Sequence, residues 1–81
     1  MPSLRKDFGN RLRTIRLERK LSQERFAEFV GISVDFLSLI ERGVNAPSFE
    51  TIEHMAKRLR VPVVALFEFG TQEQHRVQRR K

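Results

Sequence analysis

The sequence predicts an all-α, compact domain of five helices, and three observations support this class. Apolar residues recur at helical spacings of three and four in successive segments, and no segment shows the alternation of a half-buried strand. A serine precedes four of the segments, at the position where its side chain can cap a helix. With 81 residues, the chain has the size of one domain.

The first helix is expected over residues 4–19. One face of this segment carries four apolar residues: Leu4, Phe8, Leu12 and Ile15. Ser3 is the expected N-cap. Gly9 in a helix interior costs about 1 kcal/mol relative to alanine, so its presence indicates close packing at this position.

Residues 21–42 contain two short amphipathic segments joined by a glycine. Ser22 opens the first segment, which runs to Val30, and Ser33 opens the second, which runs to Arg42. Gly31 between them is expected to adopt the left-handed conformation that ends many helices. Two helices joined by a tight turn with glycine form a helix-turn-helix. The motif therefore spans about residues 22–42.

The last two helices follow a loop at residues 43–47. Ser48 is the expected N-cap of a fourth helix, and Pro62 begins a short apolar fifth helix over residues 63–69. A helix this apolar cannot bury every side in a small monomer, so we expect it to join two copies of the chain, although it could instead complete the monomer core. The expected dimer residues are Val61, Val63, Val64, Leu66, Phe67 and Phe69.

The charge of the chain is positive, with a net value of +6. Residues 1–69 hold 12 Lys/Arg and 9 Asp/Glu, and residues 70–81 hold 4 and 1, so each part contributes +3. A basic chain favours polyanions as partners. We expect a domain at 1–69 and a basic, flexible tail at 70–81, whose cations either add phosphate affinity or only solvate the end.

The composition also indicates a compartment. The chain has no cysteine, so no disulfide supports it, which fits the cytoplasm. The charged N-terminus is unlike a signal peptide, and no apolar run has the ~18 residues of a membrane span. We therefore expect a cytoplasmic protein with no membrane partner.

Residues 12–67 resemble the lambda-repressor-like family of helix-turn-helix proteins, also called the Cro/C1-type or XRE family. Controller proteins of restriction–modification systems are the family members most similar in size and helix count. The resemblance implies a DNA-binding domain whose third helix enters the major groove. It also implies a nucleoid-associated protein that is bacterial or phage-encoded. The residues that carry it are Ile15, Arg16, Leu21, Ser22, Gln23, Glu24, Phe26, Ala27, Gly31, Ile32, Ser33, Leu37, Ser38, Ile40, Glu41, Arg42, Gly43, Pro47, Ser48, Ile52, Ala56, Val61 and Pro62.

Phosphate contacts are expected from residues around the two ends of the motif. Gln23 begins the second helix, where its amide and the helix N-terminal N–H groups can both donate to a phosphate. The resemblance assigns Gln23 this role and places the loop after the third helix against the DNA backbone. Asn45 suits a turn as well as a phosphate contact. The expected phosphate-binding residues are Gln23, Arg42, Asn45, Ser48 and Arg11.

Base contacts are expected from the start of the third helix, where Leu39 is also exposed. Asp35 could accept from cytosine N4, or it could serve the helix dipole. Phe36 is either a groove contact or a core aromatic. Because no Arg or Lys lies between positions 33 and 39, readout of DNA shape must supply part of the specificity. The expected base-contacting residues are Ser33, Val34, Asp35, Phe36 and Ser38.

The resemblance also implies a partly buried salt bridge between Arg16 and Glu41, which would link the first helix to the end of the third. We assign both residues to structure, because removing one partner of a buried pair leaves an uncompensated charge.

The function predicted from these features is sequence-specific regulation of transcription by a homodimer on a palindromic or pseudo-palindromic operator. The alternative is a protein-interaction module, such as an antitoxin-like dimerising partner, because the start of the third helix is neutral to acidic. We expect no enzyme activity, since the chain lacks a glycine-rich phosphate loop, a metal cluster and paired carboxylates. No metal, cofactor or small-molecule ligand is expected.

Overall fold

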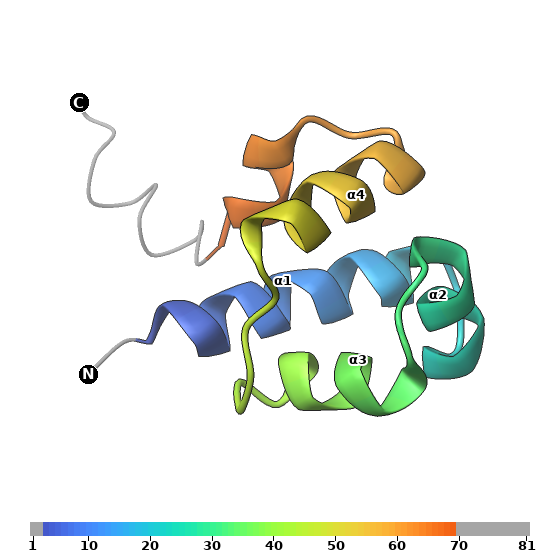
Figure 1. The fold of residues 1–81 in the computed structure, drawn as a ribbon, viewed down its shortest axis with the longest axis horizontal. Helices are drawn as coiled ribbons and strands as arrows, with labels where there is room; N and C mark the ends of the chain where they lie inside the picture. The colour runs from blue at the N-terminus through green and yellow to red at the C-terminus, as the bar shows by residue number, and fades with distance from the viewer. Residues whose placement is uncertain (1–2, 70–81) are drawn as a thin grey trace.

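Four α-helices and one 3-10 helix make up residues 3–69, the part of the chain that the computed structural model describes (Figure 1). In order, they are α1 (Leu4–Glu18), α2 (Gln23–Val30), α3 (Val34–Glu41), α4 (Phe49–Leu59) and the 3-10 helix η1 (Val63–Phe67). No strand occurs in this range, so the all-α class is confirmed. The expected flexible tail at 70–81 lies outside the described residues.

The four α-helices begin where the serines predict. Ser22 Oγ accepts from the N–H of Arg25 at 3.1 Å, and Ser33 Oγ accepts from that of Phe36 at 3.0 Å. Ser3 and Ser48 make the same contact at the starts of α1 and α4. A cap of this kind contributes about 1 kcal/mol. The local sequence therefore sets the start of every α-helix in the described range.

Gly31 ends α2 and forms the turn of the helix-turn-helix. Its φ of +84° lies in the left-handed region, and its N–H donates to the Ala27 carbonyl at 2.8 Å. A Cβ at this position would lie only 3.0 Å from Nε2 of His54 on α4. Glycine is therefore favoured both by the backbone conformation and by the helix packed above the turn.

The prediction of a fifth α-helix over residues 63–69 is wrong. The segment forms a 3-10 helix of five residues, and no side chain caps its first turn at Pro62. Nucleating an α-helix is unfavourable, and so short a segment gains few α-helical hydrogen bonds in return. Val63 and Val64 are also β-branched, which lowers helix propensity. The segment instead forms the more tightly wound 3-10 helix, which packs against α1 and α4.

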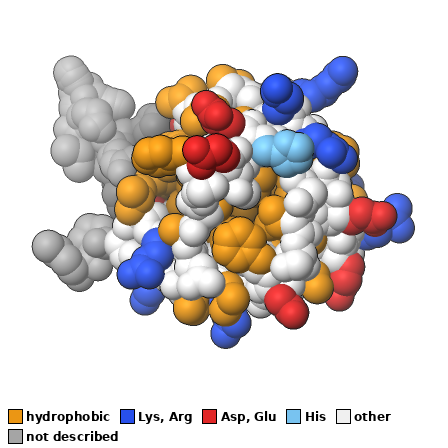
Figure 2. Space-filling model, in the orientation of Figure 1, with side chains coloured by type: hydrophobic (Ala, Val, Ile, Leu, Met, Phe, Trp, Pro, Cys, Tyr) orange, Lys and Arg blue, Asp and Glu red, His pale blue; other side chains and the backbone are white. Residues whose placement is uncertain are grey.

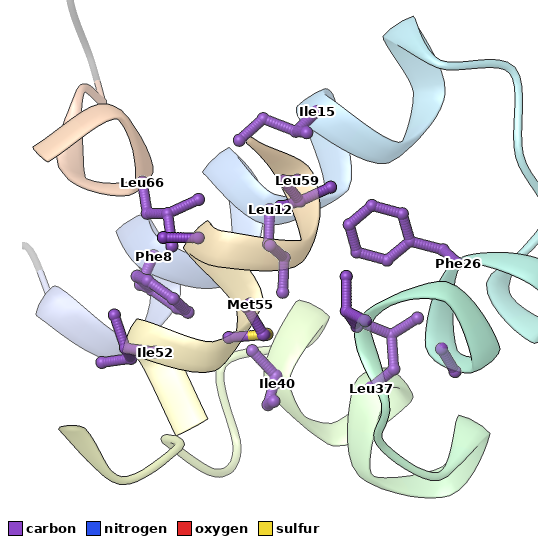
Figure 3. Packing of buried hydrophobic residues seen from close by; sticks show 13 residues of the cluster. Phe8, Leu12, Ile15, Phe26, Leu37, Ile40, Ile52, Met55, Leu59 and Leu66 are labelled. Carbon is purple, nitrogen blue, oxygen red and sulfur yellow. The ribbon is translucent and has the colours of Figure 1, made fainter. Parts of the chain in front are cut away.

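The hydrophobic core lies between α1, α4 and the two helices of the motif, α2 and α3. Phe26, Leu37 and Met55 are completely buried and come from α2, α3 and α4 (Figure 3). α1 lies between α3 on one side and η1 and α4 on the other (Figure 1). α3 packs on α1 and α2, which leaves the opposite face of α3 turned outward.

Candidate nucleic-acid interface

The outward face of α3 and the residue that follows it consists of four side chains at positions i, i+3, i+4 and i+7. Asp35 and Arg42 are exposed, and Ser38 and Leu39 are half-buried. This spacing places the four on one side of a helix, while Leu37 and Ile40 on the other side are buried completely. A helix with one buried face and one outward, mostly polar face can enter a DNA major groove.

The other expected base contacts sit at the edge of this face. Val34 and Phe36 are half-buried and pack against the core, so only part of each side chain is accessible. Ser33 is exposed but its oxygen caps α3. Leu39 was not among the expected base contacts. Its helical position places it beside Ser38, where it could touch a thymine methyl group.

The charge on this face changes from one end to the other. Asp35 lies in the first turn of α3, where a carboxylate suits the helix dipole. Arg42 lies at the opposite end, as the C-cap. α3 itself contains no Lys or Arg, so a bidentate guanine contact from within the helix is excluded.

A buried network joins α1, α2 and α3 behind this face. Arg16 donates to Glu41 through Nε at 2.7 Å and through Nη2 at 3.1 Å, which is bidentate geometry. Arg16 also donates through Nη1 to the Leu21 carbonyl at 3.0 Å. Both ion-pair residues are more than nine-tenths buried. The network fixes the end of α3 relative to the start of α2.

Gln23 is the third member of the network. Its Nε2 donates to Glu41 Oε1 at 3.0 Å. Because an ionised carboxylate only accepts, this bond determines which end of the amide faces Glu41. The amide nitrogen carries a second proton, and Gln23 is half-exposed. The side chain is thus held in one orientation at the helix N-terminus, with a donor remaining for an anion.

The loop after α3 presents exposed Asn45 next to Arg42, beside the outward face of α3. The backbone N–H groups of Val44 and Asn45 both donate to the Leu39 carbonyl, at 2.9 and 3.3 Å. These bonds hold the loop against α3 and use the Asn45 N–H within the chain. The Asn45 side chain is left to contact an external group.

Two of the expected phosphate contacts are engaged within the chain. Arg11 donates to the Ala65 carbonyl at 2.9 Å and lies 3.7 Å from Glu68, so it holds η1 against α1. Ser48 caps α4 and donates its hydroxyl proton to Thr51 Oγ1 at 3.0 Å. Both side chains therefore have structural partners that compete with a phosphate, and we leave them out of the interface.

The residues expected at a dimer surface divide between core and surface. Leu66 is completely buried and belongs to the core, so its assignment to a dimer surface is wrong. Val61, Phe67 and Phe69 are half-buried and pack against the core, and Val63 and Val64 are exposed. A neighbouring apolar groove is lined by residues from α1, the loop, α4 and η1: Leu4, Phe8, Pro47, Phe49, Ile52 and Phe67.

Other kinds of site find little support in residues 3–69. No described helix combines the length and apolarity needed to cross a membrane. Within the same range, the side chains that commonly bind metals do not gather in groups of three or more. The outward face of α3, with Gln23 and the following loop, is thus the candidate site that the fold presents best.

Comparison with known proteins agrees with this geometry. Residues 12–66 match the helix-turn-helix family. The transcriptional repressor RstR of cryptic phage CTXphi from Vibrio cholerae is 36% identical over 59 residues, which is 73% of this chain and 53% of that protein. Control protein C.BamHI from Bacillus amyloliquefaciens is 37% identical over 65 residues, or 79% of this chain and 80% of that protein.

A solved structure is similar as well. The restriction-modification controller protein C.AhdI from Aeromonas hydrophila superposes with a TM-score of 0.72 and 33% identity, covering 78% of this chain and 91% of that one. The chain spans about half the length of the phage and bacterial repressors that it matches.

The fold and the exposed face of α3 define a DNA-binding helix-turn-helix protein. The chain belongs to the helix-turn-helix family of lambda-repressor-like transcriptional regulators. This is a family of DNA-binding regulators rather than of enzymes.

Proposed function

We propose that this protein regulates transcription as a homodimer that binds a palindromic or pseudo-palindromic operator, with α3 of each copy in the major groove. The observation that carries the proposal is the outward face of α3, held in place by the network of Arg16, Glu41 and Gln23. Residues 1–69 form the DNA-binding domain in this proposal. Gln23, Arg42 and Asn45 contact phosphates, while Asp35, Ser38 and Leu39 face the bases.

The dimer surface in this proposal consists of the expected residues in and beside η1, apart from buried Leu66, together with the apolar groove between α1 and the start of α4, which Phe67 also lines. Phe49 is 83% exposed and Leu4 is 65% exposed, and both line the groove. An exposed apolar cluster of this kind marks an interaction site. The loop residues Asn45–Pro47 line it too, so a second copy docked here holds the two recognition helices in a fixed relation.

Selection from random double-stranded DNA tests the proposal. We expect a two-fold symmetric motif whose half-sites are centred about 10 base pairs, or ~34 Å, apart, because each copy reads one major-groove face. A motif without symmetry would contradict the homodimer, and the absence of any enriched sequence would contradict specific DNA binding.

The second candidate is a protein-interaction module of the antitoxin-like kind. The observation in its favour is that the exposed part of α3 carries the carboxylate of Asp35 and no cation. Elution from mixed DNA separates the two functions, because affinity for phosphates falls steeply with salt. Elution at the same low salt from DNA and from a neutral resin would favour the interaction module.

A narrower proposal is that the protein acts as a restriction–modification controller. Its support is the similarity to two proteins described as controllers, each matched over most of its length. The selected motif offers the check. For a controller that regulates its own operon, we expect the motif upstream of a neighbouring methyltransferase or endonuclease gene, whereas its absence there would contradict this role.

A further inference from the structure

The first turn of α1 packs directly on the loop that follows the recognition helix. A Cβ built on Gly43 would lie 2.5 Å from Lys6 Cγ and 3.0 Å from Lys6 Cα, so only glycine, with its φ of +76°, admits this approach. Arg5 Nη1 donates to the Val44 carbonyl at 3.2 Å. Gly9, one turn on, lies against the carbonyl groups of Ile40 and Glu41. The start of α1 and the end of α3 therefore form one rigid unit.

This contact brings cations to the end of the recognition helix. Arg5, Lys6 and Arg42 are all exposed. Figure 2 shows Lys and Arg side chains at its lower left, over the N-terminal end of α1 and the end of α3. Of the carboxylates nearby, Glu41 is buried against Arg16 and Gln23, and Asp7 is half-buried. The exposed charge at this place is positive.

We propose that Lys6 binds a DNA phosphate beside Arg42, so that the first turn of α1 is part of the DNA interface. This inference rests on the proposed function. Lys6 lies ten residues before Arg16 on α1, or about 15 Å along the helix axis. The Lys6 contact is thus a second anchor on the DNA backbone, well separated from Gln23, which is bound to Glu41 beside Arg16. Contacts of this kind position the protein without reading sequence.

Lys6 could instead only stabilise the fold, since a cation suits the carbonyl end of α3. Salt dependence separates the two roles, because each phosphate contact releases counterions and contributes about −0.9 to the slope of log affinity against log salt. The experiment compares the parent with Lys6→Gln, which keeps the inner carbons that pack on Gly43. Lys6→Arg restores the charge. Lys57→Gln is the matched control, because α4 lies on the opposite side of α1 from α3 (Figure 1).

Binding is measured between 50 and 200 mM NaCl, on a duplex with the selected motif and on a mixed-sequence duplex. For Lys6→Gln we expect weaker binding to both duplexes and a slope shallower by about 1.8, because each of the two copies in the dimer loses one phosphate contact. The parent's advantage over this variant then shrinks by about 12-fold across this fourfold salt range, which is 4 raised to the power 1.8. Lys6→Arg should match the parent in slope, and so should Lys57→Gln.

Circular dichroism melting shows whether each variant folds. If Lys6→Gln is folded and binds with the parent's slope, the inference is overturned while the proposed function stands. A loss of affinity with an unchanged slope assigns Lys6 to structure and also overturns it. If the parent itself binds neither duplex, the proposed function fails, and the inference fails with it.

Discussion

The buried pair Arg16 and Glu41 allows a quantitative test of what holds α3 in place. Replacing Arg16 with methionine keeps an apolar stem but leaves the Glu41 carboxylate, more than nine-tenths buried, without its cation. Removing one partner of a buried pair costs about 3–5 kcal/mol. Two bonds to Glu41 and one to the Leu21 carbonyl are lost together, which supports a value within that range rather than below it.

Urea unfolding followed by circular dichroism measures this loss. With an m-value of about 1 kcal/mol/M for a small domain, the midpoint should fall by about 3 M or more. The melting temperature should fall by at least ~12 °C, at about 4 °C per kcal/mol. Small domains have a total stability of only about 5–15 kcal/mol, so a variant already unfolded without urea would also agree.

Two further variants isolate the pair. Arg13→Met changes an exposed arginine on the same helix and should alter stability by less than about 0.5 kcal/mol. Arg16→Met combined with Glu41→Leu removes both charges and should recover most of the loss, because an apolar pair often replaces a buried ion pair without cost. The reasoning is refuted if the free energy of unfolding of Arg16→Met lies within about 1 kcal/mol of the parent's, or if the double variant is no more stable than Arg16→Met.

Three more predictions concern packing, DNA contact and dimerisation. Gly9→Ala, which would gain about 0.5–1 kcal/mol in an open helix, should instead lose more than about 1 kcal/mol in urea unfolding, because the added Cβ overlaps the Ile40 carbonyl oxygen. Gln23→Ala should weaken binding to every duplex about tenfold or more in a gel-shift titration, as expected for a hydrogen bond to a charged group, and equal affinities would contradict the phosphate contact. Phe49→Ala should leave unfolding of the monomer nearly unchanged but raise the dimer dissociation constant at least about fivefold in sedimentation, whereas Leu17→Ala, an exposed leucine on α1, should not.

Prediction from the sequence succeeded where the signal is local. The serine caps and the apolar spacing depend on residues a few positions apart, so the four α-helices and the turn at Gly31 were predicted closely. The form of η1 was not, because an apolar stretch of this length does not distinguish an α-helix from a 3-10 helix. The burial of Leu66 was not predicted either, because it depends on how α1 and α4 pack against η1.

The candidate site was predictable only in part. The outward positions of α3 follow from helical periodicity. The partners of Arg11 and the packing of Lys6 on Gly43 do not follow from periodicity, because these contacts join residues far apart in the chain. The Arg5–Val44 hydrogen bond, for example, spans 39 positions. Gly9 and Gly43 carried a hint of these contacts, since each glycine marks a place where another segment comes close. A glycine in the sequence does not identify the segment that comes close to it, and only the fold shows which segment that is.

The distribution of donors around α3 favours recognition of DNA shape. Arg42, Asn45 and Gln23 lie outside the helix and suit the backbone, while the face of α3 offers Asp35, Ser38 and Leu39 to the bases. One good bidentate base contact discriminates by about 1–3 kcal/mol, and α3 has no arginine or lysine for one at guanine. In the proposed dimer complex, we therefore expect much of the specificity to come from the cost of bending or narrowing the DNA between the half-sites. Scrambling those uncontacted base pairs while keeping both half-sites should therefore weaken binding by about tenfold or more, equivalent to about 1.4 kcal/mol. Equal affinity for the scrambled and original operators would show instead that the three side chains on α3 read the sequence directly.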